Sequence, residues 1–252
     1  MNTIKKIILF FSLLLACSFQ LFAQNDIQQN YTKEEIQIEM RDGVKLFTSV
    51  YAPKDKSISY PILITRMPFG SEPDKDRYSR WPSYFPHLLK EKYILVFQDV
   101  RGTYMSEGEF VEVRPYNPNK KKKETDENSD AYDTIDWLVN NVDNNNGNVG
   151  VFGISYMGFY ATMTLPNAHP ALKAVSPQAP VTDWFLGDDR HHNGAFFLMD
   201  SFPWTAAMGK PRNGPTRLNS KISFDYKIKD NYAFYKELGP IKNMQQKLTV
   251  QT

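Results

Sequence analysis

The chain has 252 residues, enough for one sizeable α/β domain or for one domain with an appendage. Its 30 basic and 28 acidic side chains leave a formal charge of +2, so the composition does not indicate a nucleic-acid partner. A basic run over residues 120–123 is followed at once by Glu124, Asp126 and Glu127. We interpret this run as a solvated loop in preference to a phosphate-binding patch.

The N-terminal segment is typical of a secretory signal. Lys5 and Lys6 precede an apolar run over residues 7–16, and polar residues begin at Gln24. This apolar run is too short for a membrane-spanning helix. We therefore predict a signal peptide over residues 1–23 and no stable membrane span in the mature protein.

The single cysteine, Cys17, lies inside this segment and raises a lipoprotein alternative. That alternative fits less well, because Leu15 stands directly before Ala16. In either case the mature protein has no disulfide and depends on core burial for its stability. We expect export to the periplasm or the extracellular space.

Strand patterns dominate the first hundred residues of the mature chain. Residues 36–40 and 44–51 alternate apolar and polar side chains around the turn at 41–43, which predicts a β-hairpin. Residues 62–64 and 93–97 are continuous apolar runs, as expected of strands buried on both faces. The sequence thus begins with a hairpin and continues into a buried sheet.

Helices and strands then alternate. We predict a short helix over 83–91, a helix over 131–140 with Asp130 as N-cap, and a strand over 171–175 that stops at Pro177. Such alternation implies βαβ units and a mostly parallel sheet.

The most informative stretch follows a turn at residues 144–147. A short apolar run over 149–152 leads to Gly153, then to a lone Ser155 and then to residues with helical spacing. Strand, sharp turn and helix with a serine at the apex is the nucleophile-elbow arrangement. The usual glycine two residues after the serine is replaced by Met157, and Gly158 follows, so the motif is G-x-S-Y-x-G.

Three predicted strand ends carry unusual residues: Phe69, the loop Asp99 to Arg101, and Ser155. Reactive groups in parallel sheets collect at the carboxyl ends of strands, so this convergence favours Ser155 as a nucleophile over Ser155 as a turn former. For Asp99 and Arg101 we favour a structural ion pair, because arginine stays charged and cannot shuttle protons.

From Pro180 onward the sequence changes character. Aromatic residues, including Trp184 and Phe185, are interleaved with Asp188, Asp189 and a His191-His192 pair. We predict the beginning of a helical cap. The aromatic side chains either pack or line a substrate pocket, and the Asp and His residues either bind a substrate amino group or form a salt-bridged helix turn.

These motifs resemble the Xaa-Pro dipeptidyl-peptidase and cocaine-esterase group of serine hydrolases. The resemblance rests on Gly153 to Gly158, on Asp99 to Gly108 and on Met67 to Phe69. Within the group, Gly187 to Asp189 and His192 to Phe196 most resemble the α-amino-acid ester hydrolases. The matches extend from about Glu35 to Trp204.

The resemblance implies an α/β-hydrolase fold whose mostly parallel sheet carries an N-terminal β-hairpin, followed by a helical cap and a C-terminal jelly roll. We assign residues 31–180 to an incomplete hydrolase core and 181–252 to a partial cap. The chain would then stop before the remaining core and the jelly roll, leave a sheet edge poorly covered and be inactive alone.

The resemblance also implies a Ser-Asp-His triad with Ser155 as nucleophile and the Tyr156 backbone N–H as an oxyanion donor. The acid and the histidine should follow the cap, yet the only histidines after Ser155 are His169, His191 and His192. Either the chain ends before its triad is complete, which we favour, or cap histidines rebuild it.

A second departure is Phe69, which stands where the resemblance implies a tyrosine that donates to the oxyanion. Phenylalanine has no donor, so either another group such as Tyr104 substitutes or the enzyme is slow.

The sequence therefore predicts an exported serine hydrolase that acts on a small ester, amide or peptide substrate. The alternative is a non-catalytic remnant or binding protein that retains the scaffold. Neither a metal site nor a cofactor site is indicated. The candidate pocket residues are Tyr104, Trp184, Phe185, Asp189 and His192.

Overall fold

The computed structural model describes residues 27–71, 82–183, 185–187, 190–208, 214–217, 225–226, 230–240 and 243. The described residues form two compact units. The first contains those up to Val181 together with those of Gly214–Leu218, and the second contains those of Thr182–Asn213 and Asn219–Thr252. The signal segment with Cys17, and also Trp184, Asp188 and Asp189, lie outside the described residues.

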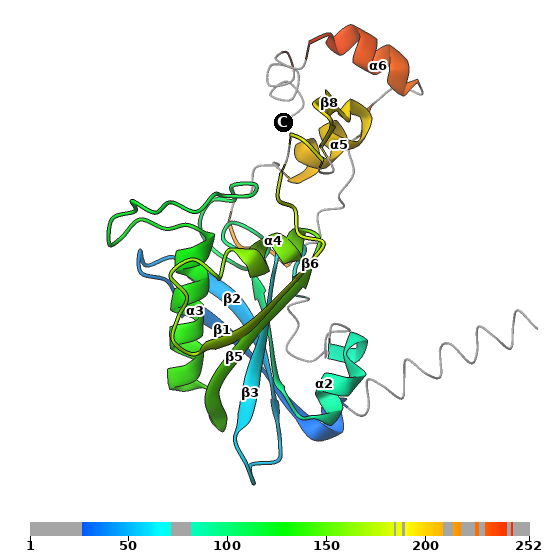
Figure 1. Ribbon diagram of the computed structural model, residues 1–252. Coiled ribbons are helices and arrows are strands. Elements are labelled where there is room, and N and C mark those ends of the chain that lie inside the picture. The colour runs from blue at the N-terminus through cyan, green and yellow to red at the C-terminus, as the bar shows by residue number, and fades with distance from the viewer. Residues whose placement is uncertain are drawn as a thin grey trace, which may run out of the picture. The chain divides into compact units, whose positions relative to one another are not determined.

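The first unit is built on a six-stranded sheet of order β1-β2-β4-β3-β5-β6 (Figure 1). The first two strands form the predicted antiparallel hairpin, and β2 also pairs antiparallel with β4. The remaining pairs, β4 with β3, β3 with β5 and β5 with β6, are parallel. The prediction of a mostly parallel sheet behind a hairpin is confirmed. The strands are β1 (Tyr31–Glu39), β2 (Lys45–Pro53), β3 (Tyr60–Met67), β4 (Ile94–Asp99), β5 (Asn145–Ile154) and β6 (Leu172–Gln178).

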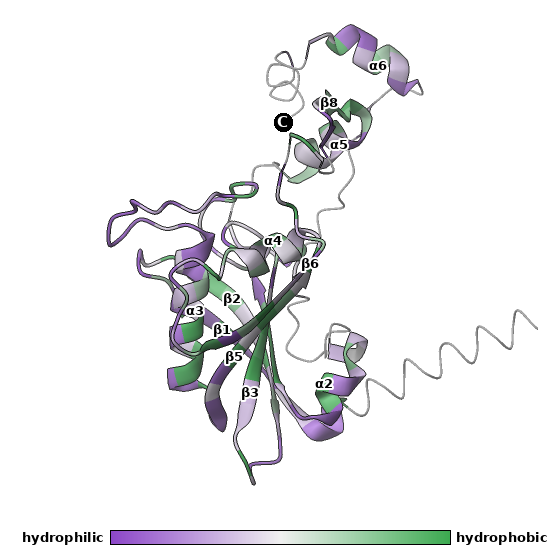
Figure 2. Cartoon of the chain, in the orientation of Figure 1, coloured by the Kyte–Doolittle hydropathy of each residue, from purple (hydrophilic) through white to green (hydrophobic). Residues whose placement is uncertain are grey.

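The central strands bury both of their faces. Along β4, Ile94 and Val96 enter one apolar cluster, whereas Leu95 and Phe97 enter another on the opposite face. Successive side chains of a strand point to opposite faces, so a continuous apolar run is what two buried faces require. Figure 2 shows the contrast between these hydrophobic strands and the more hydrophilic loop that leads from β4 to the next helix.

Helices cover the two faces (Figure 1). One cluster contains Ile135 and Leu138 of α3, and the other is packed against Leu88 and Leu89 of α2. Besides the helical residues 27–30, the described helices of this unit are the 3₁₀ turn η1 (Pro82–Tyr84), α2 (Pro86–Lys90), α3 (Glu127–Asn141) and α4 (Tyr156–Thr162).

The predicted N-cap of α3 is wrong. The helix begins four residues earlier than the position Asp130 implied, and Asp126 is the N-cap. Its side chain accepts from the Ser129 N–H at 2.8 Å, and the Ser129 hydroxyl accepts from the Asp126 N–H at 2.8 Å, a reciprocal capping box. Asp130 is instead a buried residue of the first helical turn.

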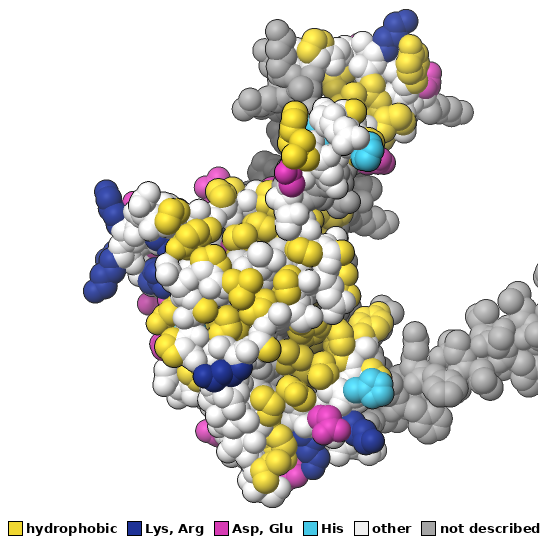
Figure 3. Space-filling view, viewed as in Figure 1, with side chains coloured by type: hydrophobic (Ala, Val, Ile, Leu, Met, Phe, Trp, Pro, Cys, Tyr) yellow, Lys and Arg dark blue, Asp and Glu magenta, His cyan; other side chains and the backbone are white. Residues whose placement is uncertain are grey.

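The strand β6 forms one edge of the sheet. It continues through Pro177 to Gln178 and does not stop at the proline, because an edge strand tolerates a residue that lacks an N–H. Ile154, at the end of β5, and Leu165, after α4, are 49% and 52% exposed. Figure 3 shows hydrophobic side chains gathered on the visible face of the sheet unit.

The second unit combines a small hairpin with two helices. The hairpin pairs β7 (His191–His192) with β8 (Ala195–Phe196), and the helices are α5 (Leu198–Met208) and α6 (Asn231–Leu238). The hairpin was not predicted. Phe202 and Leu238 are fully buried between the two helices and the aromatic rings that surround them. Among the described helices of either unit, none is both long enough and apolar enough to cross a bilayer.

Candidate active site

Ser155 occupies the junction between β5 and α4. Its backbone has φ 59° and ψ −120°, a left-handed conformation that residues with a side chain rarely adopt. The Ser155 N–H donates to the Gln178 carbonyl at 2.9 Å, and the Ser155 carbonyl accepts from the Phe159 N–H at 3.1 Å. Both backbone groups are thus anchored, while the residue itself is exposed. The strand, sharp turn and helix predicted around this serine are all confirmed.

Two glycines allow this bend. A Cβ on Gly153 would lie 2.1 Å from the Met157 carbonyl oxygen, in the first turn of α4. A Cβ on Gly158 would lie 2.7 Å from the Gln178 carbonyl oxygen, at the end of β6. Contacts this short with backbone atoms exclude any larger residue. The glycine after Met157 therefore serves the packing of α4 on β6, which explains its position in the motif.

Tyr156 follows the serine and begins α4. Its side chain is buried, stacks on the Tyr160 ring at 5.3 Å between centroids, and meets the Phe69 ring edge-on at 6.2 Å. The Tyr156 hydroxyl accepts from the Val113 N–H at 3.1 Å. The structure thus brings Phe69, from the end of β3, beside the residue whose backbone was predicted to hold an oxyanion.

Tyr104 lies at the same place. Its ring packs so closely over Gly70, the residue after Phe69, that a Cβ there would lie 2.9 Å from it. Burial, and then the negative charge of Asp99, raise the pKa of the Tyr104 hydroxyl above its usual value. A tyrosine with a raised pKa keeps its proton at neutral pH and retains a donor.

Buried polar contacts shape the loop after β4. The Asp99 carboxylate accepts from the Ser71 N–H at 2.6 Å and from the Met105 N–H at 3.3 Å. The predicted ion pair requires correction: Arg101 forms its ion pairs with Asp42 at 2.8 Å and Asp130 at 2.7 Å. Sequence proximity suggested the wrong partner: Asp99 accepts from backbone N–H groups, whereas the carboxylates that meet Arg101 come from 59 and 29 positions away along the chain.

The described pocket candidates of the second unit lie around the hairpin. Phe185 is 61% exposed, and its ring contacts the His191 ring at 5.4 Å. His191 also contacts Phe196, its partner across the hairpin, at 5.0 Å. His192 stacks on Phe197 at 6.4 Å. The predicted helix turn is instead a hairpin, in which His191 contacts two aromatic rings and the exposed His192 stacks on one.

His169 has a different environment. Its Nε2 lies 3.3 Å from the Asp136 carboxylate, its Nδ1 accepts from the Ala171 N–H, and its ring meets Tyr132 edge-on at 4.7 Å. These contacts connect the loop before β6 to α3. Within the described ranges, no group of three or more His, Cys, Asp or Glu side chains is arranged to hold a metal ion.

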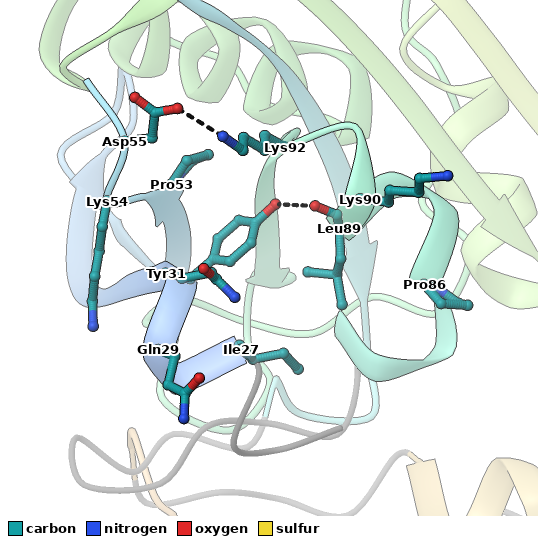
Figure 4. Close-up of a pocket in the computed structure, with 11 residues that line it drawn as sticks. Ile27, Gln29, Tyr31, Pro53, Lys54, Asp55, Pro86, Leu89, Lys90 and Lys92 are labelled. Atoms are coloured by element: carbon teal, nitrogen blue, oxygen red, sulfur yellow. Dashed lines mark hydrogen bonds and ion pairs between the residues drawn. The ribbon is translucent and has the colours of Figure 1, made fainter. Parts of the chain in front are cut away.

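A pocket of about 390 Å³ lies between the start of β1, the end of β2 and α2 (Figure 4). Inside it the Tyr31 hydroxyl donates to the Leu89 carbonyl at 3.2 Å, and Lys92 forms an ion pair with Asp55 at 2.7 Å. Because β2 runs antiparallel to β4, the end of β2 lies beside the start of β4. The pocket is therefore at the amino-terminal ends of the parallel strands, whereas Ser155 follows the carboxyl end of β5. The predicted site residues are absent from its lining.

Sequence reasoning missed a buried charged pair near the elbow. Arg66 on β3 and Glu127 on α3 lie 3.3 Å apart, with 1% and 4% of their side chains exposed. The signal available in the sequence was an arginine inside a mostly apolar strand, Ile62 to Met67, since a charge buried in a sheet needs a partner.

Known proteins share this architecture. An α-amino acid ester hydrolase aligns with 88% of this chain at 36% identity and a TM-score of 0.71, over 36% of its own length. An aminopeptidase from the marine sediment archaeon Thaumarchaeota archaeon aligns with 85% of this chain at 38% identity and a TM-score of 0.71, over 35% of its own length. These matches show that the sheet and helices form part of an α/β-hydrolase fold.

Sequence relatives agree. Cocaine esterase from Rhodococcus sp. (strain MB1 Bresler) is 30% identical over 184 residues, which are 73% of this chain and 30% of that protein. The chain thus spans about a third of the length of these relatives. Residues 42–240 match the X-Pro dipeptidyl-peptidase (S15) family, a span that includes the elbow, the loop after β4 and both described helices of the second unit. The chain therefore belongs to the X-Pro dipeptidyl-peptidase (S15) family.

Proposed function

We propose that this protein is a serine hydrolase that cleaves small esters, amides or peptides through an acyl-enzyme on Ser155. The observation that carries the proposal is the backbone of Ser155, which holds a non-glycine residue at φ 59° and exposes it where parallel strands end. Strain of this kind costs about 1–3 kcal/mol and persists where the surrounding structure imposes it, as at catalytic residues.

The reaction follows from a hydroxyl held in this way. The Ser155 oxygen attacks the carbonyl carbon of the substrate, a histidine accepts the hydroxyl proton, and the Tyr156 N–H stabilises the tetrahedral oxyanion. The leaving alcohol or amine departs with that proton. Water then attacks the acyl-enzyme, releases the carboxylic acid and restores the serine.

The histidine and its acid partner are not assigned to residues of this chain. His169 lies beside the Asp136 carboxylate and the Tyr132 ring, and His191 and His192 contact aromatic rings of their own hairpin and the residue after it. In elbow hydrolases the acid and the histidine follow the serine in that order. We propose that they belong to sequence that continues this chain, and that the 252 residues alone are inactive.

The relatives of this chain suggest a particular kind of acyl substrate. The two solved relatives with 38% and 36% identity are an aminopeptidase and an α-amino acid ester hydrolase, and both names refer to substrates with an amino group beside the reacting carbonyl. We propose that this protein also prefers an acyl group with a free α-amino nitrogen. An α-aminoacyl p-nitrophenyl ester should be hydrolysed faster than its N-acetylated counterpart.

A serine-directed fluorophosphonate probe tests the nucleophile. The protein, expressed as this chain and with any sequence that continues it, should label at Ser155. Ser155→Ala should remove the label, whereas Ser176→Ala, which changes an exposed serine of β6, should leave it unchanged. Labelling that survives Ser155→Ala, or no labelling in any expressed form, would support the alternative of a non-catalytic scaffold.

Export is part of the proposal. A basic start, an apolar run and Ala23 directly before Gln24 support a cleaved secretory signal. N-terminal sequencing of the mature protein should begin at Gln24. A mature protein that begins at a lipid-modified Cys17 would instead establish the lipoprotein alternative.

A further inference from the structure

A buried cluster of ionisable groups lies behind the elbow. Arg66, on β3, is almost entirely enclosed, and its Nε donates to the Gln98 side-chain oxygen at 2.8 Å. Its Nη1 donates to the backbone carbonyl of Glu127 at 2.9 Å. The guanidinium is therefore held by oriented neutral acceptors on β4 and α3. Its Nη2 makes no hydrogen bond to a described residue and lies 3.9 Å from a carboxylate oxygen of Asp130.

The Glu127 carboxylate is buried, and hydrogen bonds from the protein do not replace all those that water would supply. Its Oε2 lies 3.3 Å from Arg66 Nη1, yet this oxygen makes no hydrogen bond within the described part of the chain. Burial raises the pKa of Glu127 to about 7, although the charge of Arg66 opposes the change. The other charges that act on it are Asp130, which raises its pKa, and Arg114 and Arg101, which lower it.

Tyr160 connects this cluster to the elbow. Its ring lies over the Arg66 guanidinium at 5.8 Å and stacks on the Tyr156 ring at 5.3 Å, with 25° between the ring planes. Its hydroxyl is buried and interacts with the Tyr156 side chain, although no hydrogen bond of standard distance and angle joins it to a described residue. Burial, and then the charge of Glu127, raise the pKa of Tyr160 well above its ordinary value. Arg66 thus lies between the Glu127 carboxylate and the Tyr160 ring.

We propose that Glu127 is a positioning residue whose proton sets the packing of Tyr160 on Tyr156, and through it the backbone beside Ser155. A protonated carboxyl is neutral and carries an O–H donor, whereas an ionised carboxylate is negatively charged and only an acceptor. The two protonation states therefore present a different partner to Arg66, whose guanidinium lies against the Tyr160 ring. Because Tyr160 and Tyr156 share the single short helix α4, a change at one ring reaches the other.

The part of this proposal that concerns catalysis rests on the proposed function, but the coupling itself can be measured without activity. The chain has 14 tyrosines, so ¹⁵N-tyrosine labelling gives a simple amide spectrum in which Tyr156→Phe identifies the Tyr156 peak. In the full wild-type chain this peak should move between pH 5 and 9 with a midpoint near 7. A stationary peak would overturn the proposal even if no variant could be prepared.

Variants assign the titration. Glu127→Gln keeps the size of the side chain and removes its ionisation, so the Tyr156 peak should become independent of pH. Asp143→Asn, which removes an exposed carboxylate just after α3, should leave the titration intact. Tyr160→Phe removes the hydroxyl and should reduce the movement. A Tyr156 peak that titrates equally in Glu127→Gln would contradict the proposal.

The reactivity of the elbow gives a second readout. If Ser155 labels, the ratio of the Glu127→Gln to the wild-type labelling rate should change across pH 7, whereas a merely structural role would lower the rate by a constant factor. An absence of labelling together with a titrating Tyr156 peak would disprove only the proposed function. Labelling with a stationary peak would disprove only the role of Glu127.

Discussion

The parallel strands β5 and β3 have their carboxyl ends on the same side of the molecule, but the residues that follow these two ends are constrained differently. At the end of β5 the backbone decides the residues: Gly153 has no room for a Cβ, and Ser155 has a positive φ. At the end of β3 Phe69 has no positive φ, and its ring meets that of Tyr156 edge-on. A phenylalanine and a tyrosine would both satisfy this packing.

The comparison distinguishes a backbone constraint, at the end of β5, from a side-chain hydrogen-bond donor, at the end of β3. A backbone constraint cannot be lost without unfolding the turn, so the elbow persists whatever the serine does. A side-chain donor can be lost at no cost to the fold, because the Phe69 ring fills the same space without the hydroxyl. The residues at the end of β5 thus determine the geometry of the turn. The residue at the end of β3 determines only whether a side-chain donor is present for an oxyanion.

The largest expected effect comes from breaking the β5 end. Gly153→Ala places a Cβ 2.1 Å from the Met157 carbonyl, so α4 must move, and we expect a loss of about 3 kcal/mol or more in the free energy of unfolding. Gly147→Ala is the matched control. Its φ is also positive, at +74°, but nothing lies within 4 Å, so its cost should be about 1–2 kcal/mol. Urea unfolding of both variants checks the difference, and equal costs would show that the close approach at Gly153 does not matter.

Restoring the donor at the β3 end should give the next largest effect. Phe69→Tyr adds a hydroxyl at the position where the family resemblance places an oxyanion donor, and one such donor is worth about 10²–10³ in rate. We expect the labelling rate, or kcat of an active form, to rise by up to about 10²-fold. Tyr104→Phe in the wild-type background is the companion measurement. A large loss there, with no gain from Phe69→Tyr, would identify Tyr104 as the substitute donor.

The pH dependence of the free energy of unfolding tests the contact between Glu127 and Arg66, near the end of β3. Glu127 has a folded pKa of about 7 against an ordinary value of 4.5, so the native state binds the extra proton between these values. Its contribution to stability is fully present below about pH 4.5 and is lost as the pH rises through 7. Glu127→Gln should flatten this decline in urea titrations at successive pH values, whereas Asp143→Asn should preserve it. An unchanged slope in Glu127→Gln would assign the decline to other groups.

The smallest effect concerns the start of α3, which carries Glu127 to its position. Asp126→Ala removes the N-cap and should cost about 1 kcal/mol. This cost should appear as a lower free energy of unfolding, while the Tyr156 amide peak at fixed pH should change little. Glu124→Ala, in the preceding loop, should cost less than Asp126→Ala, and the reverse order would argue against the capping box.

Much of the core unit could be predicted because its signals are local. The alternation in β1 and β2, the continuous apolar runs of β3 and β4, and the turn at Gly43 each follow from neighbouring residues. The cap of α3 could not be predicted so directly, because Asp126 and Asp130 are both acceptable N-caps. Only the capping box with Ser129 and the burial of Asp130 beside Arg101 distinguish them.

The sequence by itself indicated the elbow, because Gly153, Ser155 and Gly158 lie between a β run and a helical pattern and because two other predicted strand ends also carry unusual residues. It also determined that Phe69 lacks a donor, since that depends on chemistry alone. Tertiary structure alone decided which charges meet: Arg101 with Asp42 and Asp130, and Arg66 with Glu127. Such pairs join residues tens of positions apart along the chain. Their partners are set by the order of strands in the sheet, which sequence spacing does not encode.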